Sequence, residues 1–366
     1  MEVTIKKAAV KKTHNFSAGP AILPAEVIKE TAQGVLNLNG TGLSVLEMSH
    51  RGKDIGAIAD EATQSIKDLM GLSDEYEVLW MSGGASSQFF ITAMNLLDDG
   101  DKAAYVDTGT WASKAIEAAR QFGNIDVLAS SKSTTYDNIP RKYRVPSDAK
   151  FLHLTSNNTI YGTQYHWLPT TDAPIVCDMS SDFLSRPIDV ARYGLIYAGA
   201  QKNLGPAGVT VVIVKKDLLG KVQRQIPAML DYRTFIKEKS MYNTPPVFAI
   251  YVCMLTLRWI KKMGGLAAME KHNKKKANIL YKEIDSNPLF KGNVEKRDRS
   301  MMNVCFTMYN RDLEPVFAQF AKDNGVSGIE GHRSVGGFRA SIYNAMPLKS
   351  VKFLADLMKE FAEKYA

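Results

Sequence analysis

The chain has 366 residues, of which 45% are hydrophobic and 23% are charged, and its net charge is +8. This composition is typical of a globular protein large enough for two domains, and it excludes a disordered chain. No stretch approaches the ~20 apolar residues of a membrane-spanning helix, and no signal peptide is visible. Since the three cysteines show no C-x-x-C pairing, we expect a reducing, cytoplasmic setting without a disulfide framework.

Two clusters of lysines account for part of the basic excess. They comprise Lys6, Lys7, Lys11 and Lys12 near the start, and Lys271, Lys274, Lys275 and Lys276 in one helix-like stretch. Such clusters are usually solvated faces, and this is the interpretation that we prefer. The alternative is a bias toward anionic partners, either nucleic acid or phosphorylated metabolites. Residues 1–15 are expected to form a loose basic tail.

From residue 16 to about residue 255, short apolar strands alternate with helical patterns. Helices are expected over about 25–38, 54–70 and 111–122, and another follows the glycine-rich turn after a strand at 77–81. Further strands are expected in KAAYVDTG, KFLHLTSN, APIVCDMS, LIYAGAQ and GVTVVIVK. This alternation predicts a layered α/β domain with a mainly parallel sheet, whose ligands bind at the carboxyl ends of the strands.

The pattern changes at about residue 254. A long helical stretch is expected to reach about residue 285, and strands are expected in NVCFTMY and GGFRASIYN. Helices are expected in LEPVFAQFAKDNG and over 348–364. We therefore interpret residues 16–255 as a large domain and residues 256–366 as a smaller α/β domain. The motifs G-x-G-x-x-G, G-x-x-x-x-G-K-[ST] and H-E-x-x-H are absent, so nucleotide binding and zinc proteolysis have no local support.

Lys202 is the most informative residue of the chain. It follows an apolar run in YAGAQKNLGPAG and precedes a turn rich in glycine and proline. Desolvation lowers the pKa of a lysine, and a neutral amine forms a Schiff base with an aldehyde. Asp178 ends another apolar run, and such an acid pairs with the pyridinium nitrogen of pyridoxal phosphate (PLP). A lone buried lysine is usually structural, but the combination predicts a PLP enzyme.

Other polar residues follow strands or begin helices and could complete a PLP site. GGASSQ (83–88) turns from strand into helix, where free backbone amides suit a phosphate, and Trp111 could stack on an aromatic ring. Thr159 offers a hydroxyl to the phenolic oxygen of PLP. Gln201, Asn243 and Thr244 are further donors for its phosphate. Each feature alone is at least as often an ordinary turn or packing contact.

Two basic clusters suit an anionic substrate. One is His50 and Arg51 in EMSHRGK, and the other is His332, Arg333 and Arg339 in GHRSVGGFRASIYNAMP. The planar guanidinium group binds carboxylate and phosphate through two parallel hydrogen bonds. Each cluster alone is more often a surface charge on a loop. Together with a PLP site, they predict a doubly or triply anionic substrate.

These motifs together closely resemble the phosphoserine aminotransferases, class V aminotransferases among the fold type I PLP enzymes. The resemblance covers nearly the whole chain, through NFSAGPAILP, EMSHRGK, GGASSQF, TSNNTIYGTQ, DMSSDFLSRP, YAGAQKNLGPAG, YNTPP and GHRSVGGFRASIYNAMP. It implies a mainly parallel seven-stranded sheet in the PLP-binding domain. It also implies amino transfer from L-glutamate to 3-phosphohydroxypyruvate in serine biosynthesis. Members of the family often also serve the 4-phosphohydroxy-L-threonine step of pyridoxine biosynthesis.

The resemblance further implies a role for each candidate residue around the cofactor. Lys202 would carry PLP and move the substrate proton, Asp178 would hold the pyridinium nitrogen, Trp111 would stack on the ring and Thr159 would bind the phenolic oxygen. The groups on the PLP phosphate would be Ala85, Ser86 and Gln201 of one chain and Asn243 and Thr244 of a second subunit. This arrangement requires a homodimer with composite active sites.

For the substrate, the resemblance implies that Arg339 binds the α-carboxylate. The distal phosphate or carboxylate would be bound by His50, Arg51, His332 and Arg333, some of them across the dimer interface. No metal, nucleic acid or membrane partner is implied. Ser86 stands where some relatives have an arginine, so one contact to the substrate phosphate is missing. Ser156 and Asn158 replace the proline and the glutamate of many relatives.

Two rival functions are open at this stage. A cysteine desulfurase, also of class V, needs an exposed cysteine on a mobile loop. Cys305 lies in the apolar run NVCFTM and is expected to be buried. A basic nucleic-acid-binding protein is compatible with the net charge, but no recognition motif supports it.

Overall fold

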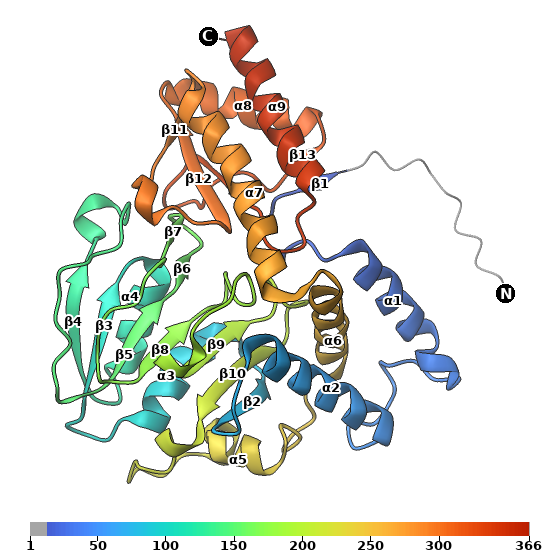
Figure 1. The fold of residues 1–366 in the computed structure, drawn as a ribbon, viewed down its shortest axis with the longest axis vertical. Helices are drawn as coiled ribbons and strands as arrows, with labels where there is room; N and C mark the ends of the chain where they lie inside the picture. Colours follow the sequence, from blue (N-terminus) through green and yellow to red (C-terminus); the bar gives the residue numbers. More distant parts are fainter. Residues whose placement is uncertain (1–12, 366) are drawn as a thin grey trace.

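A computed structural model describes residues 13–365 of the chain (Figure 1). Most of the expected basic tail at 1–15 lies outside the described residues. None of the helices within the described range is long and apolar enough to cross a membrane.

The centre of the structure is a seven-stranded sheet. In spatial order its strands are β2 (Tyr76–Met81), β10 (Thr210–Lys215), β9 (Tyr193–Gly199), β8 (Ile175–Asp178), β5 (Ala149–Thr155), β3 (Lys102–Asp107) and β4 (Asn124–Ser130). The neighbours from β9 to β4 pair in parallel, while β10 is antiparallel to both of its neighbours. The expected mainly parallel sheet is confirmed, and its seven strands match the family resemblance.

Helices cover both faces of this sheet. The first face packs on α1 (Ala25–Leu36), α2 (Lys53–Met70) and α6 (Val247–Lys262), with a core that alternate strand residues such as Trp80, Leu154 and Ile213 help to form. The second face packs on α3 (Gly84–Leu96), α4 (Thr110–Ala119) and α5 (Tyr232–Lys237), with Tyr105 and Tyr197 in its core. Because successive strand side chains point to opposite faces, each strand contributes to both layers.

A second group of elements lies above the large sheet in Figure 1. Its antiparallel sheet contains β11 (Phe290–Gly292), β12 (Asn303–Met308) and β14 (Phe338–Ser341), and its helices are α7 (Gly265–Ser286), α8 (Glu314–Asp323) and α9 (Leu348–Tyr365). Two short pairs complete the fold, β1 (His14–Asn15) with β13 (Val326–Ser327) and β6 (Asn157–Asn158) with β7 (Thr163–Gln164). A separate core, with Phe306, Phe317 and Phe361, holds this group together.

The stretch expected to be helical up to about residue 285 is confirmed as helical, but reading it as continuous is wrong. The chain forms α6 and α7 instead, and the break falls at Gly264 and Gly265, which have φ values of +97° and +75°. Only glycine adopts such values without strain, so this pair permits the change of direction. The interpretation of the second lysine cluster as a solvated face is also wrong at one position, because Lys276 is completely buried.

Candidate active site

Lys202 lies in the turn that follows β9, at the carboxyl edge of the sheet. Its Nζ donates a hydrogen bond of 2.8 Å to the hydroxyl of Thr159, just after β6. Part of the residue reaches the surface, but desolvation of the amine lowers the pKa of Lys202 to about 8. The charge of Asp178 opposes this shift and that of Arg339 adds to it. The structure therefore brings four predicted residues close enough to interact, namely Lys202, Thr159, Asp178 and Arg339.

Asp178 is the last residue of β8, the strand next to β9. It is buried, and the backbone N–H of Ser180 donates to its Oδ1 at 2.9 Å. Burial raises the pKa of Asp178, while the hydrogen bonds from Ser180 and the charge of Lys202 lower it. A buried carboxylate with few partners is stabilised by any cation that enters beside it.

Two helices begin at the same edge of the sheet. Trp111 is the second residue of α4, and its Nε1 is buried without a hydrogen-bond partner among residues 13–365. Ala85 and Ser86 lie in the first turn of α3, after Gly83 and Gly84 with positive φ. The first backbone amides of a helix have no partner within the helix, so this turn presents free donors.

Arg339 lies on β14, opposite Cys305 of β12. Its Nε is buried and has no partner within the described part of the chain. His332 is partly buried and Arg333 is exposed. Burial and then the charges of Arg339 and Arg333 lower the pKa of His332, so this loop lies near Arg339. The predicted cluster of three basic residues therefore forms one positive region.

His50 and Thr244 belong to a different place in the chain's own structure. Both line a cavity of about 490 Å³ between the segment before α2 and the start of α6. The Nε2 of His50 is buried there without a partner in the described range. Arg51 and Thr244 are exposed, and Asn243 Nδ2 donates to the Thr244 carbonyl at 3.1 Å. No interaction found within residues 13–365 joins these four residues to Lys202.

Comparison with known proteins identifies the family. The sequence profile of Aminotransferase class-V matches residues 13–354. The phosphoserine aminotransferase of Flavobacterium psychrophilum is 54% identical over 354 residues, which cover 96% of this chain and 99% of that protein. The chain belongs to the phosphoserine aminotransferase family. The resemblance read from the sequence motifs is thereby confirmed.

Solved structures of this family have the same fold. One phosphoserine aminotransferase, studied for radiation damage of its Schiff base, superposes with a TM-score of 0.95 at 47% identity, over 97% of this chain and 100% of that one. The PLP-bound phosphoserine aminotransferase of Trichomonas vaginalis gives a TM-score of 0.90 at 37% identity, over 95% and 100% of the two chains. The α/β architecture predicted from the sequence is therefore that of the family.

The two buried departures from the phosphoserine aminotransferase pattern have visible contacts. Ser156 donates its backbone N–H to the carbonyl of Asp178 at 3.0 Å, and its hydroxyl bonds Asp182. Proline has no N–H, so it could not make the first bond. Asn158 bonds Thr108 and Thr163 at 3.1 and 3.0 Å, next to the turn that leads to Trp111. Both residues support neighbours of the site.

Two residues that the sequence analysis did not select also support the site of this aminotransferase. Tyr343 donates to the carbonyl of Ala18 at 2.7 Å and thereby anchors the N-terminal loop. A Cβ added to Gly19 in that loop would lie 3.5 Å from Cγ of Lys202, so the loop covers the lysine. Asn203 bonds Ser181 and Asn344 through its side chain. Both residues lie inside recognised motifs, but neither has a side chain that indicates a supporting role.

The cysteines do not support the desulfurase alternative. All three are free and buried. The Cys305 thiol lies 3.5 Å from the carbonyl of Ile160, and burial raises its pKa to about 12. The predicted burial of Cys305 is confirmed, and a buried, protonated thiol is a poor nucleophile. Among the described residues, no group of three or more His, Cys, Asp or Glu could hold a metal ion.

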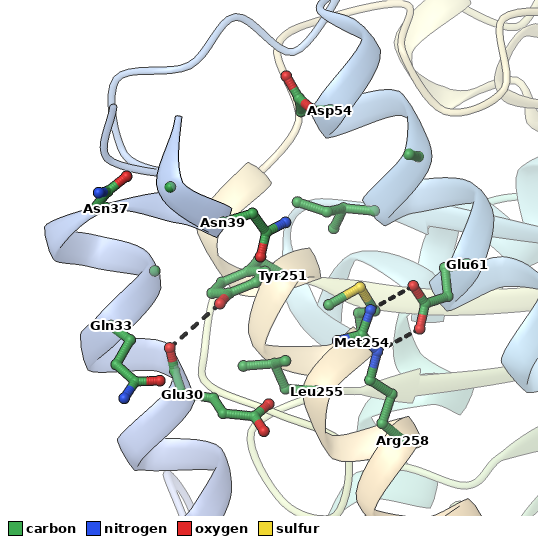
Figure 2. Close-up of a pocket in the computed structure, with 14 residues that line it drawn as sticks. Glu30, Gln33, Asn37, Asn39, Asp54, Glu61, Tyr251, Met254, Leu255 and Arg258 are labelled. Carbon is green, nitrogen blue, oxygen red and sulfur yellow. Dashed lines mark hydrogen bonds and ion pairs between the residues drawn. The ribbon is translucent and has the colours of Figure 1, made fainter. Parts of the chain in front are cut away.

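A separate pocket of about 600 Å³ lies between α1, α2 and α6 (Figure 2). Glu30, Asp54 and Glu61 are among its lining residues, and none of the predicted site residues lines it. Arg258 bonds both carboxylate oxygens of Glu61, at 2.5 and 2.7 Å. The remaining carboxylates would repel an anionic substrate, so this pocket is not the active site.

Proposed function

We propose that this enzyme transfers the amino group from L-glutamate to 3-phosphohydroxypyruvate, with PLP as cofactor, and produces O-phospho-L-serine and 2-oxoglutarate. One observation carries the proposal above all. The Lys202 amine, with a pKa of about 8, is bonded to Thr159 and lies within the fields of Asp178 and Arg339. The names of relatives that share about half of the residues over nearly the whole chain support the same reaction.

The residues at the carboxyl edge of the sheet suit PLP. The buried Asp178 would pair with the pyridinium nitrogen, and the Thr159 hydroxyl would hold the phenolic oxygen. Trp111, at the start of α4, would stack on the ring, and the first turn of α3 would hold the phosphate together with Gln201. When bound, PLP supplies the electron sink that stabilises negative charge at the α-carbon of the substrate.

The chain's own groups then perform three tasks. Lys202, which is partly neutral near pH 8, would accept the proton from the substrate α-carbon and donate it to C4′ of the cofactor. Arg339, whose Nε lacks a partner among the described residues, holds the α-carboxylate. The N-terminal loop at Ala18 and Gly19 covers the lysine and limits the access of water.

The remaining basic residues bind the distal anionic group of the substrate. His332 and Arg333 approach from the loop before β14, close to Arg339. Arg333 is exposed, so it is free to bind a phosphate that carries more charge than a carboxylate. Because Ser86 contributes no positive charge, binding of the phosphate depends more strongly on His332 and Arg333.

We further propose a homodimer in which His50, Arg51, Asn243 and Thr244 serve the active site of the second subunit. His50 and Thr244 share one cavity, although they are 194 positions apart in the chain. Leu43 and Leu46 on the segment before His50 expose 47% and 61% of their surface. Such exposed apolar residues suit a subunit interface. The buried, free cysteines support a cytoplasmic location.

The direct test is an assay of the purified enzyme with L-glutamate and 3-phosphohydroxypyruvate. We expect stoichiometric 2-oxoglutarate and O-phosphoserine, and no sulfide from L-cysteine. Borohydride treatment should fix the cofactor to Lys202, and Lys202→Ala should abolish turnover while the protein still folds. The absence of phosphoserine, or label on any other lysine, would contradict the proposal.

A further inference from the structure

Lys276 of α7 is a buried lysine that the proposed chemistry does not use. Its side chain has no exposed surface, whereas Lys271, Lys274 and Lys275 on the same helix are exposed. Burial lowers the pKa of Lys276 because water no longer solvates the ammonium group. A buried amine is costly unless other groups satisfy its donors, so its partners indicate why it is there.

Those partners are three successive backbone carbonyls. Nζ of Lys276 donates to the oxygens of Ile342, Tyr343 and Asn344, at 2.9, 2.5 and 3.4 Å. The Lys276 nitrogen thus contacts the carbonyl oxygens of three different peptide groups. Three consecutive carbonyls point at one atom only when the backbone turns around it, so Lys276 fixes the shape of this segment.

The segment 342–344 connects the strand that carries Arg339 with the loop that carries Lys202. It follows β14, which carries Arg339 three residues before Ile342. At its other end, the Asn344 N–H donates to Oδ1 of Asn203 at 2.9 Å, and Asn203 is the neighbour of Lys202. The same turn of backbone therefore contacts the Lys202 loop and continues into the Arg339 strand.

A second residue on the same face of α7 strengthens this connection. Asn273 is completely buried, and its Nδ2 donates to Oδ1 of Asn344 at 2.8 Å and to the Ser185 carbonyl at 3.1 Å. Residues three positions apart lie on one face of a helix. Asn273 and Lys276 together therefore hold the segment against α7.

We propose that Lys276 is a positioning residue for amino transfer, which holds segment 342–344 so that Arg339 and Lys202 keep their relative placement. The inference rests on the proposed function only in assigning the α-carboxylate to Arg339. Without the amine, three adjacent carbonyls lose their common donor and the segment relaxes. Displacements of about 1 Å far from the reacting atoms can reduce rates by about a hundred-fold.

The test uses the holoenzyme with Lys276→Met, which keeps the length of the side chain but has no donors. We expect KM to rise about ten-fold for both substrates, since both present an α-carboxylate to Arg339. The pH midpoint of the cofactor's visible absorption band, measured without substrate, should also shift. Lys276→Gln, which retains two donors, should fall between Met and wild type. Lys275→Met, on the exposed face of the same helix, should behave as wild type.

The outcomes separate positioning from plain stability. A folded Lys276→Met enzyme with a lower unfolding temperature, but with unchanged KM values and band midpoint, overturns the proposal. If that variant does not fold, Lys276→Gln and Asn273→Ala carry the same test, and unchanged values in both overturn it equally. The band midpoint needs no substrate, so a shift there supports the inference even if the wild-type enzyme fails the phosphoserine assay.

Discussion

The amine of Lys202 donates a 2.8 Å hydrogen bond to the hydroxyl of Thr159, a residue 43 positions earlier in the chain. This bond joins the turn after β9 to the residue after β6. Lys202 lies beyond the carboxyl end of β9 and Thr159 beyond that of β5, both strands of the large sheet, and α/β folds bind their ligands at this edge. The bond also holds the amine in a place where burial outweighs the attraction of Asp178. The reactivity of Lys202 therefore depends on the fold rather than on its local sequence.

The first prediction concerns the stability of the enzyme without cofactor as a function of pH. The folded-state pKa of Lys202 is lowered from 10.5 to about 8, so between these values the unfolded chain binds more protons than the folded one. Stability due to this group must therefore rise with pH across this window. Below this window, the buried charge of Lys202 lowers the free energy of unfolding by a constant amount, on the order of 3 kcal/mol or less. Lys202→Met removes the penalty.

Thermal unfolding of both cofactor-free proteins at several pH values checks this. We expect Lys202→Met to be the more stable protein at pH 7, by a margin that shrinks steadily toward pH 10.5. Titrating groups that do not interact with Lys202, such as Lys276, are common to both proteins and cancel in the difference. A margin that is independent of pH would show that the amine of Lys202 has an ordinary pKa.

The second prediction concerns Asp178. Asp178→Asn should lower turnover by orders of magnitude, because a neutral amide cannot stabilise the protonated pyridine nitrogen and the ring loses its electron-sink character. PLP should still bind, since the proposed site for its phosphate at the start of α3 is unchanged by this substitution. Single-turnover kinetics with glutamate and a cofactor titration measure the two effects separately. Turnover near the wild-type value would mean that another residue holds the nitrogen.

The third prediction concerns the composite site. A Lys202→Ala chain and an Asn243→Ala/Thr244→Ala chain are each expected to be inactive. Mixed after unfolding and refolding, they should form heterodimers in which one site has all of its groups. Random pairing restores about a quarter of the sites. The activity of the mixture is the measurement.

A matched control distinguishes composite sites from sites within one chain. Lys202→Ala mixed with Asp178→Asn should give no recovery, because both residues belong to the same subunit's site. Heterodimers can be verified by a tag on one chain. If the first mixture also stays inactive while heterodimers are present, Asn243 and Thr244 do not serve the second subunit.

The sequence indicated the strands of the large sheet unevenly. Strands buried on both faces, such as β9 and β10, are continuous apolar runs and were predicted. The edge strand β4 was not predicted, because its side chains are exposed or partly exposed along its length and its apolar run, VLA, has only three residues. Its pairing with β3 is a tertiary interaction, which no local pattern reveals.

The candidate site shows the same limit. Asp178 and Lys202 could be selected because one ends an apolar run and the other follows one, and the charge of Asp178 acts on the Lys202 amine in the structure. Lys276 could not be distinguished from Lys275 by sequence, since both are charged residues in a basic stretch. Only the position of segment 342–344 against α7 makes one of them a buried donor. The break at Gly264 was also missed, since the helical pattern continues on both sides.

The last prediction concerns how the substrate's two anionic groups are distinguished. Arg339 should bind the α-carboxylate that both substrates share, so Arg339→Lys should impair L-glutamate and 3-phosphohydroxypyruvate alike. Losing a bidentate contact to a charged group costs on the order of 1.5–3 kcal/mol, about ten- to a hundred-fold in affinity.

Arg333→Ala should instead impair the phosphorylated substrate more, since phosphate carries more charge and more acceptor oxygens than a γ-carboxylate. Because Ser86 provides no positive charge, no arginine at that position compensates. The kcat/KM values of both variants for both substrates check this. Equal losses in Arg333→Ala would mean that Arg333 supports the fold or the dimer rather than the phosphate.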